Sequence, residues 1–116
     1  MTAWKALELR IARMWGGTRS GPTGRDGPDV AGVPLAIQIK RTGNQTGGIK
    51  GAWVKQAQRD GTKARLPWVL VVAGHNDRRP VAVVDHAWLV EVYMTARQQP
   101  GAELHLVPLD GEDAAA

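Results

Sequence analysis

Residues 27–42, GPDVAGVPLAIQIKRT, contain the pattern that decides the fold. Successive side chains of a β-strand point to opposite faces, and the second part of this stretch alternates between apolar and other residues. We therefore predict two short strands, residues 29–31 and 33–41, joined by a tight glycine turn. The core-facing side of the second strand consists of Leu35, Ile37 and Ile39. Gln38 and Lys40 then lie together on its opposite face.

An amphipathic helix is predicted before these strands, over residues 2–15, because its apolar side chains recur at the spacing of one helical face. Glu8 lies at the edge of that face, so it is the one acid of the helix that points inward. The alternative is an ordinary border residue paired with an arginine. Residues 16–27 are rich in Gly, Pro, Arg and Ser, and we expect a loop there.

The chain after these strands predicts a helix over residues 49–59, with Trp53 and Ala57 facing inward. Residues 66–74 and 79–86 are strongly apolar, which predicts two largely buried strands at the centre of a sheet. A further helix is expected from Asp85, its N-cap. Its inward side chains are predicted to be Trp88, Leu89, Val92, Tyr93 and Ala96.

The predicted order is helix, strand, strand, helix, strand, strand, helix, or αββαββα. This order indicates a single-domain α/β fold with a central mixed β-sheet flanked by helices. The length of 116 residues, 43% of them hydrophobic, is enough for one core. We expect residues 1–110 to form this domain, with an added edge strand within residues 102–109, and residues 111–116 to form a flexible C-terminal tail.

The composition favours a soluble protein of the cytoplasm. The sequence has no cysteine, no apolar run long enough to span a membrane and no recognisable signal segment. It also lacks the glycine-rich patterns that bind nucleotide phosphates, so neither a membrane nor a nucleotide cofactor is expected.

The charge is distributed unevenly along the chain. Residues 1–65 hold 12 Lys and Arg against 4 Asp and Glu, a net charge of +8, whereas residues 66–116 hold 3 against 7, a net charge of −4. A basic half with a few isolated acids is typical of a surface that binds a polyanion around a metal site. The alternative is a basic face that only contacts solvent.

Three features together resemble the PD-(D/E)XK nuclease superfamily: Glu8 on the first helix, Pro28-Asp29 at the start of a strand, and Gln38-Ile39-Lys40 on the next strand. The nearest likeness is to small archaeal-type Holliday junction resolvases and their phage relatives. It covers roughly residues 5–93 and implies a restriction-endonuclease-like core.

The resemblance implies that Glu8, Asp29, Gln38 and Lys40 are catalytic. It also implies that Mg²⁺, or Mn²⁺, is held by Glu8, Asp29, the Gln38 side-chain carbonyl and the Ile39 backbone carbonyl. The metal would make a nucleophile from water and stabilise phosphate charge, while Lys40 orients that water. One departure stands out: the usual acid of the (D/E)XK triplet is Gln38, so either the site is active with Gln or it has lost its chemistry.

The implied activity is symmetric cutting of DNA four-way junctions by a homodimer in a bacterial or phage-infected cell. A hydroxyl near the scissile phosphate is expected from Thr18 or Ser20, and the sequence does not choose between them. The residues expected to contact DNA are Arg10, Arg13, Thr18, Arg19, Ser20, Arg25, Arg41, Lys50, Lys55 and Arg59. Aromatic residues left over from so small a core are candidates for the dimer interface, namely Trp53, Trp68, Trp88 and Tyr93.

Three other functions stay open. The same core serves nucleases that act on ordinary duplex or single-stranded DNA. A non-catalytic basic DNA-binding module would use Asp29 as a turn residue and Lys40 as a phosphate contact. A small scaffold subunit would leave Glu8 and Asp29 unconnected.

Overall fold

The centre of the fold is a pair of parallel strands, β3 (Ala36–Arg41) and β4 (Trp68–Ala73). The computed structural model describes residues 3–20, 27–42, 48–74 and 80–101. On the other side of β4, β5 (Val81–Val84) pairs in the antiparallel direction. The chain is therefore a small α/β domain with a mixed three-stranded sheet in the order β3-β4-β5, as expected from the apolar runs.

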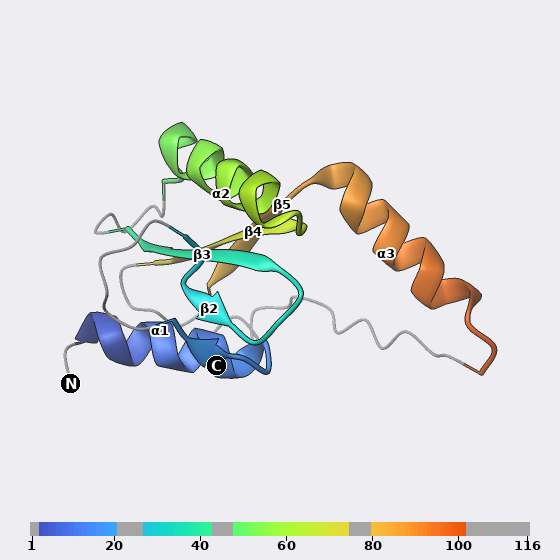
Figure 1. The fold of residues 1–116 in the computed structure, drawn as a ribbon, viewed down its shortest axis with the longest axis horizontal. Helices are drawn as coiled ribbons and strands as arrows, with labels where there is room; N and C mark the ends of the chain where they lie inside the picture. The colour runs from blue at the N-terminus through green and yellow to red at the C-terminus, as the bar shows by residue number, and fades with distance from the viewer. Residues whose placement is uncertain (1–2, 21–26, 43–47, 75–79, 102–116) are drawn as a thin grey trace.

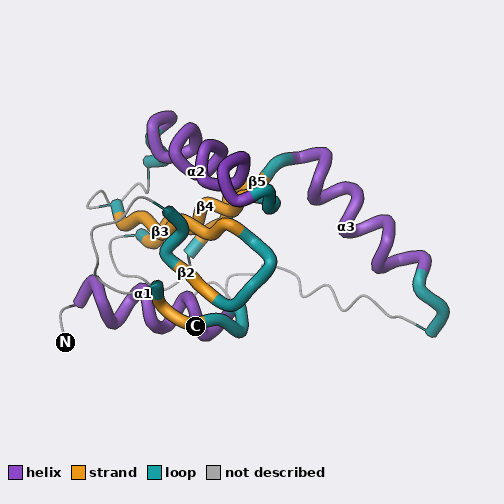
Figure 2. Tube along the Cα trace, viewed as in Figure 1, coloured by secondary structure: helices purple, strands orange, loops and turns teal. Residues whose placement is uncertain are grey.

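Helices cover both faces of this sheet, α1 (Ala3–Met14) on one side and α2 (Gly51–Ala64) on the other (Figure 1, Figure 2). The alternation along the strands decides which helix each side chain meets. The cluster on the α1 side includes Leu7, Ile11, Ile37, Ile39, Val69 and Val71. The cluster on the α2 side consists of Ala57, Leu70 and Val72, with Trp53, Val54, Trp68 and Val83 packed around it. The predicted core face of β3 is confirmed. On α1, Leu7 and Ile11 are buried as predicted, but Trp4 and Met14, at the two ends of the same apolar stripe, are exposed.

A second, two-stranded antiparallel sheet joins β1 (Thr18–Arg19) to β2 (Val30–Ala31). The prediction of a plain loop over residues 16–27 was wrong at β1, where pairing with a distant segment supplies the hydrogen bonds that the local sequence does not signal. Gly17 permits this approach, because a Cβ there would lie 2.5 Å from the Ala31 carbonyl oxygen. The element order is thus αβββαββα, with one strand more than predicted.

Helix α2 is longer than predicted and continues to Ala64, after which Arg65 adopts a left-handed conformation with φ of 57°. Ala57 is fully buried, as expected. Gly61 faces β4 closely: a Cβ there would lie 2.9 Å from both the Leu66 carbonyl oxygen and the Trp68 Cβ. This glycine lets the helix lie against the sheet.

Helix α3 (His86–Gln98) begins as predicted, since the Asp85 carboxylate accepts a hydrogen bond from the Trp88 N–H at 3.0 Å. The prediction that its apolar residues face inward was wrong for most of them. Trp88 packs against the core, but Leu89, Val92 and Tyr93 are exposed, and the helix points away from the body (Figure 1).

Strand β5 was predicted to be largely buried and is instead a partly exposed strand at the sheet edge, with Val81 52% exposed. Apolar composition signals a strand but does not say whether another element will cover it. The predicted edge strand and tail, residues 102–109 and 111–116, lie outside the described residues. No helix in the described part of the chain is both long and apolar enough to cross a membrane.

Candidate active site

Asp29 is fixed by backbone contacts at the edge of the central sheet. Its N–H donates to the Ile37 carbonyl at 2.7 Å, and its carboxylate accepts a hydrogen bond from the Ile39 N–H at 2.8 Å. On the other side, the Ser20 N–H donates to the Asp29 carbonyl at 2.9 Å. These bonds bring Asp29 to β3, and Ser20, next to β1, holds it from the other side. The two strands predicted over residues 29–31 and 33–41 do not pair with each other as a ladder, because β2 pairs with β1 and lies outside the sheet of β3.

Glu8 reaches the same region from α1. It is 6% exposed, which confirms that it points inward, and its carboxylate pairs with the Arg19 guanidinium at 3.1 Å. The pairing with an arginine that an ordinary border residue would make is thus also present. Arg19, predicted to contact DNA, is held in the candidate site by this ion pair.

Three acids and one lysine share this neighbourhood. Burial raises the pKa of Asp29 above its ordinary value of 3.8, and the carboxylates of Glu8 and Asp60 raise that pKa further. The hydrogen bond from Ile39 and the Lys40 ammonium act in the opposite direction. Asp29 is therefore a partly desolvated carboxylate with negative neighbours, an arrangement that favours a bound cation.

Gln38 is 2% exposed, and its amide orientation is fixed. Its Nε2 donates to the Gly27 carbonyl at 2.6 Å and also to the Asp60 carboxylate. Both partners are acceptors, so the NH₂ group must face them and the carbonyl oxygen must not.

Asp60 was missed by the sequence analysis. It is the single acid between Asp29 and Asp77. It lies in α2 at the i+3 position from buried Ala57 and next to buried Gly61, and it is itself 8% exposed. This spacing puts an acid on the inward face of a helix, the same signal that identified Glu8.

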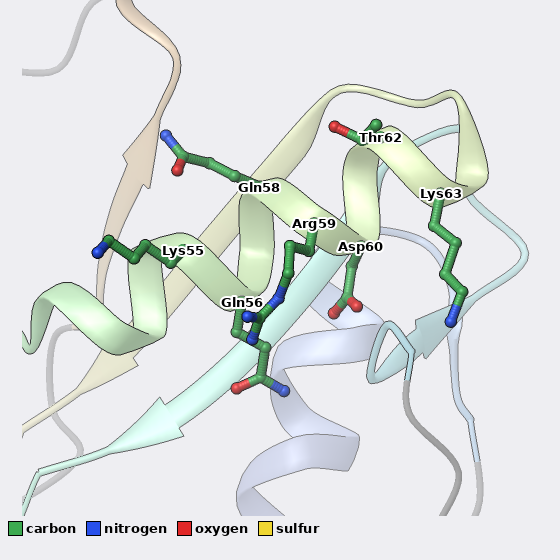
Figure 3. A pocket seen from close by; sticks show the side chains of 7 residues that line it. All are labelled: Lys55, Gln56, Gln58, Arg59, Asp60, Thr62 and Lys63. Carbon is green, nitrogen blue, oxygen red and sulfur yellow. The ribbon is translucent and has the colours of Figure 1, made fainter.

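Basic and amide groups line a shallow hollow along α2, next to Asp60 (Figure 3). Its lining residues are Lys55, Gln56, Gln58, Arg59, Asp60, Thr62 and Lys63. Gln56, Arg59, Asp60 and Lys63 recur at i, i+3, i+4 and i+7, and their side chains project from the side of α2 that faces β3 (Figure 3). Arg59, predicted to contact DNA, thus lies on the same helix face as Asp60.

The other predicted DNA contacts are dispersed. At about 100° per residue, Arg10 and Arg13 lie roughly 140–160° around α1 from Glu8, away from the site. Thr18 is exposed, whereas the Ser20 hydroxyl donates to the Pro28 carbonyl at 2.9 Å, beside Asp29.

The remaining predicted contacts that the structure describes lie on β3, on α2 and just before α2. Arg41 ends β3 and is exposed, and Lys55 is exposed on α2. Lys50 precedes α2, with its ammonium 5.4 Å from the Trp53 ring centroid. Arg25 lies outside the described residues.

The donor set fits a hard divalent cation. Glu8 and Asp29 supply carboxylates in partly buried positions, and Gln38 adds a neutral amide, all of them ligand types that Mg²⁺ and Mn²⁺ accept. The Ile39 backbone is beside Asp29, with its N–H on that carboxylate. Within the described ranges, no group of three or more His, Cys, Asp or Glu side chains is arranged to hold a metal ion. The candidate ligands Glu8, Asp29 and Gln38 are two carboxylates and an amide, so they do not make a group of three such side chains.

Comparisons with family models, curated proteins and solved structures give no match to this chain. The functional argument therefore depends on the residues and their geometry.

Proposed function

We propose that this protein is a metal-dependent DNA endonuclease with a restriction-endonuclease-like core of the PD-(D/E)XK kind, using Mg²⁺ or Mn²⁺. The observation that carries the proposal is the position of Asp29. Its carboxylate is hydrogen-bonded to the strand that carries Gln38 and Lys40, and it lies close enough to Glu8 and Lys40 for their charges to shift its pKa.

Each residue has a part in phosphodiester hydrolysis. A bound Mg²⁺ would polarise a non-bridging phosphate oxygen and acidify water. Glu8 and Asp29 supply the two negative charges that hold the cation, and the Gln38 carbonyl oxygen adds a neutral ligand. Lys40, half-buried on β3, places an ammonium group beside Asp29, where it orients the attacking water and offsets negative charge developing on the phosphate.

The DNA would lie across the side of the molecule that α2 and β3 share. Arg59 and Lys63 line the hollow beside Asp60, and Arg41 is exposed at the end of β3. Contacts from such side chains to phosphates position the duplex without reading its sequence. We propose four-way junctions as the substrate and a homodimer with two identical sites as the active form in the cytoplasm of a bacterial or phage-infected cell.

A cleavage panel tests this proposal. The full-length protein is incubated with a labelled four-way junction, a linear duplex and a single strand, each with Mg²⁺ and with EDTA. Paired nicks near the branch point that need Mg²⁺ are expected. Equal cutting of all three substrates would support a nuclease but contradict the preference for junctions. Binding without cutting would contradict the nuclease activity itself.

A non-catalytic DNA-binding module is the second candidate, because Gln38 replaces an acid and Glu8 is paired with Arg19. It predicts that EDTA leaves DNA affinity unchanged and that no nicks form with Mg²⁺ or Mn²⁺. A nuclease for ordinary duplex or single-stranded DNA is separated from the junction resolvase by the same panel.

A further inference from the structure

The buried contact between Gln38 and Asp60 joins β3 to α2 at the candidate site. Gln38 is 2% exposed and Asp60 is 8% exposed, and the Gln38 NH₂ group donates to the Asp60 carboxylate. We infer that Asp60 is a positioning acid, which fixes Gln38 and supplies through its amide the negative charge that position 38 itself lacks. This inference rests on the proposed metal site.

The packing of α2 against the sheet supports a specific contact between Asp60 and Gln38. A buried carboxylate is costly unless it is hydrogen-bonded. Here the helix presents Ala57 and Gly61, two small residues, on either side of Asp60 along its buried face. Gly61 has no room for a Cβ against β4, so the helix lies close enough for the short Asp60 side chain to reach the sheet.

The negative charge of Asp60 also affects the Gln38 carbonyl oxygen, at the opposite end of the amide. A carboxylate that accepts from the NH₂ group favours negative charge on the amide oxygen, because linked hydrogen-bonding groups polarise one another. Acids that accept from metal-binding histidines act in the same way, orienting the ligand and raising its basicity. Asp60 would thus make a neutral amide a stronger ligand for a hard cation.

The geometry also limits where the Gln38 oxygen can lie. Two acceptors, the Gly27 carbonyl and the Asp60 carboxylate, occupy the NH₂ side. Turning the amide over would place its oxygen against both of them, so Asp60 and Gly27 together select one of the two orientations. The position of the ligand oxygen is set before the metal arrives.

Mn²⁺ binding by the full-length protein tests the inference, with free Mn²⁺ measured by electron paramagnetic resonance. The variants are Asp60→Asn, the exchange Gln38→Glu with Asp60→Asn, and the control Asp85→Asn at the N-cap of α3. An asparagine can still accept the Gln38 hydrogen bond, so the first variant removes charge while keeping the contact. The exchange keeps the contact between positions 38 and 60 and the net charge, but it removes the hydrogen bond to the Gly27 carbonyl.

We expect Asp60→Asn to weaken Mn²⁺ binding at least tenfold, the exchange to return affinity to within about threefold of wild type, and Asp85→Asn to have no effect. Circular dichroism confirms folding. If Asp60→Asn does not fold, Asp60→Ser replaces it, because its hydroxyl accepts the same bond without charge.

The outcomes separate this inference from the proposed function. Wild-type protein that binds no Mn²⁺ would overturn the metal site and the inference together. Wild-type binding that Asp60→Asn leaves unchanged would overturn the inference alone. A loss that the exchange does not restore would overturn the claim that the charge of Asp60 acts through position 38.

Discussion

Asp29 lies where its ionised carboxylate is less favourable than it would be in water. Burial and the charges of Glu8 and Asp60 raise its pKa, and only the Ile39 N–H and Lys40 oppose them. Asp29→Asn keeps an oxygen that accepts from Ile39 and removes the repulsion. We expect the variant to be more stable than wild type in EDTA by about 1 kcal/mol, a rise in Tm of a few degrees. Thermal unfolding in EDTA and in Mg²⁺ checks this, and Mg²⁺ should stabilise wild type alone. A variant less stable than wild type in EDTA would contradict it.

The pH dependence has a definite sign. An acid whose pKa is higher in the folded than in the unfolded state binds more protons when folded, so its contribution stabilises at low pH. The contribution of Asp29 to stability in EDTA should therefore fall as pH rises from about 3.8 through its raised pKa. Asp29→Asn should remove that part of the decline, seen as the difference between the denaturation midpoints of the two proteins across this range. Parallel curves would contradict the raised pKa.

Most of the candidate site could be predicted at the residue scale. Alternation along 33–41 placed Gln38 and Lys40 on one face, and helical spacing placed Glu8 inward. Asp60 was available from the same kind of spacing, but no motif directs attention to it. The pairing of Arg19 with Glu8 could not be predicted, because it depends on β1, a two-residue strand formed by contact with β2.

At the scale of elements, the sequence pattern within each helix or strand predicted where that element lies, but it did not predict which elements contact one another. The strands β3 and β4 carry their own signal in apolar residues, and α3 carries its cap in Asp85. The exposure of β5 and α3 depends on which element covers them, which no local pattern states. Gly61 is a residue whose role the sequence does not reveal. It is a glycine because α2 approaches β4 closely there, which only the folded structure shows.

Gly61→Ala tests that approach of α2 to the sheet. A Cβ there would meet the Leu66 backbone oxygen and Trp68 at 2.9 Å, so the helix must shift. Overpacking of this kind costs about 1–3 kcal/mol, which exceeds the gain of up to about 1 kcal/mol from replacing a helical glycine with alanine. Urea denaturation should show lower stability. Gly51→Ala, in the same helix with open space around its Cβ, should show no loss; equal effects of the two changes would refute the packing account.

At the scale of the whole molecule, α3 presents an apolar face that the described part of the body does not cover. Leu89, Val92 and Tyr93, at i, i+3 and i+4, are 50%, 44% and 42% exposed. We propose that the second copy of the proposed homodimer covers this face, because the proposed symmetric cutting would need two copies and an apolar surface of this kind marks an interaction site.

Leu89→Glu combined with Val92→Glu places two charges in that face. We expect dimeric wild type and a monomeric variant in size-exclusion chromatography with light scattering, with unchanged circular dichroism. Glu91→Gln, on the opposite side of α3, should stay dimeric. A monomeric wild type, or a variant that stays dimeric, would rule out this surface as the interface.

The most direct test of the central claim compares three proteins prepared side by side on a labelled four-way junction with Mg²⁺. Wild type and Asp85→Asn should nick the junction in pairs near the branch point, because Asp85 caps α3 after β5, across β4 from the strand that Asp29 contacts. Asp29→Asn should bind the junction with similar affinity and leave it intact. Cutting by all three would show that Asp29 is not catalytic, and binding by all three without cutting would show that the protein binds the junction without hydrolysing it.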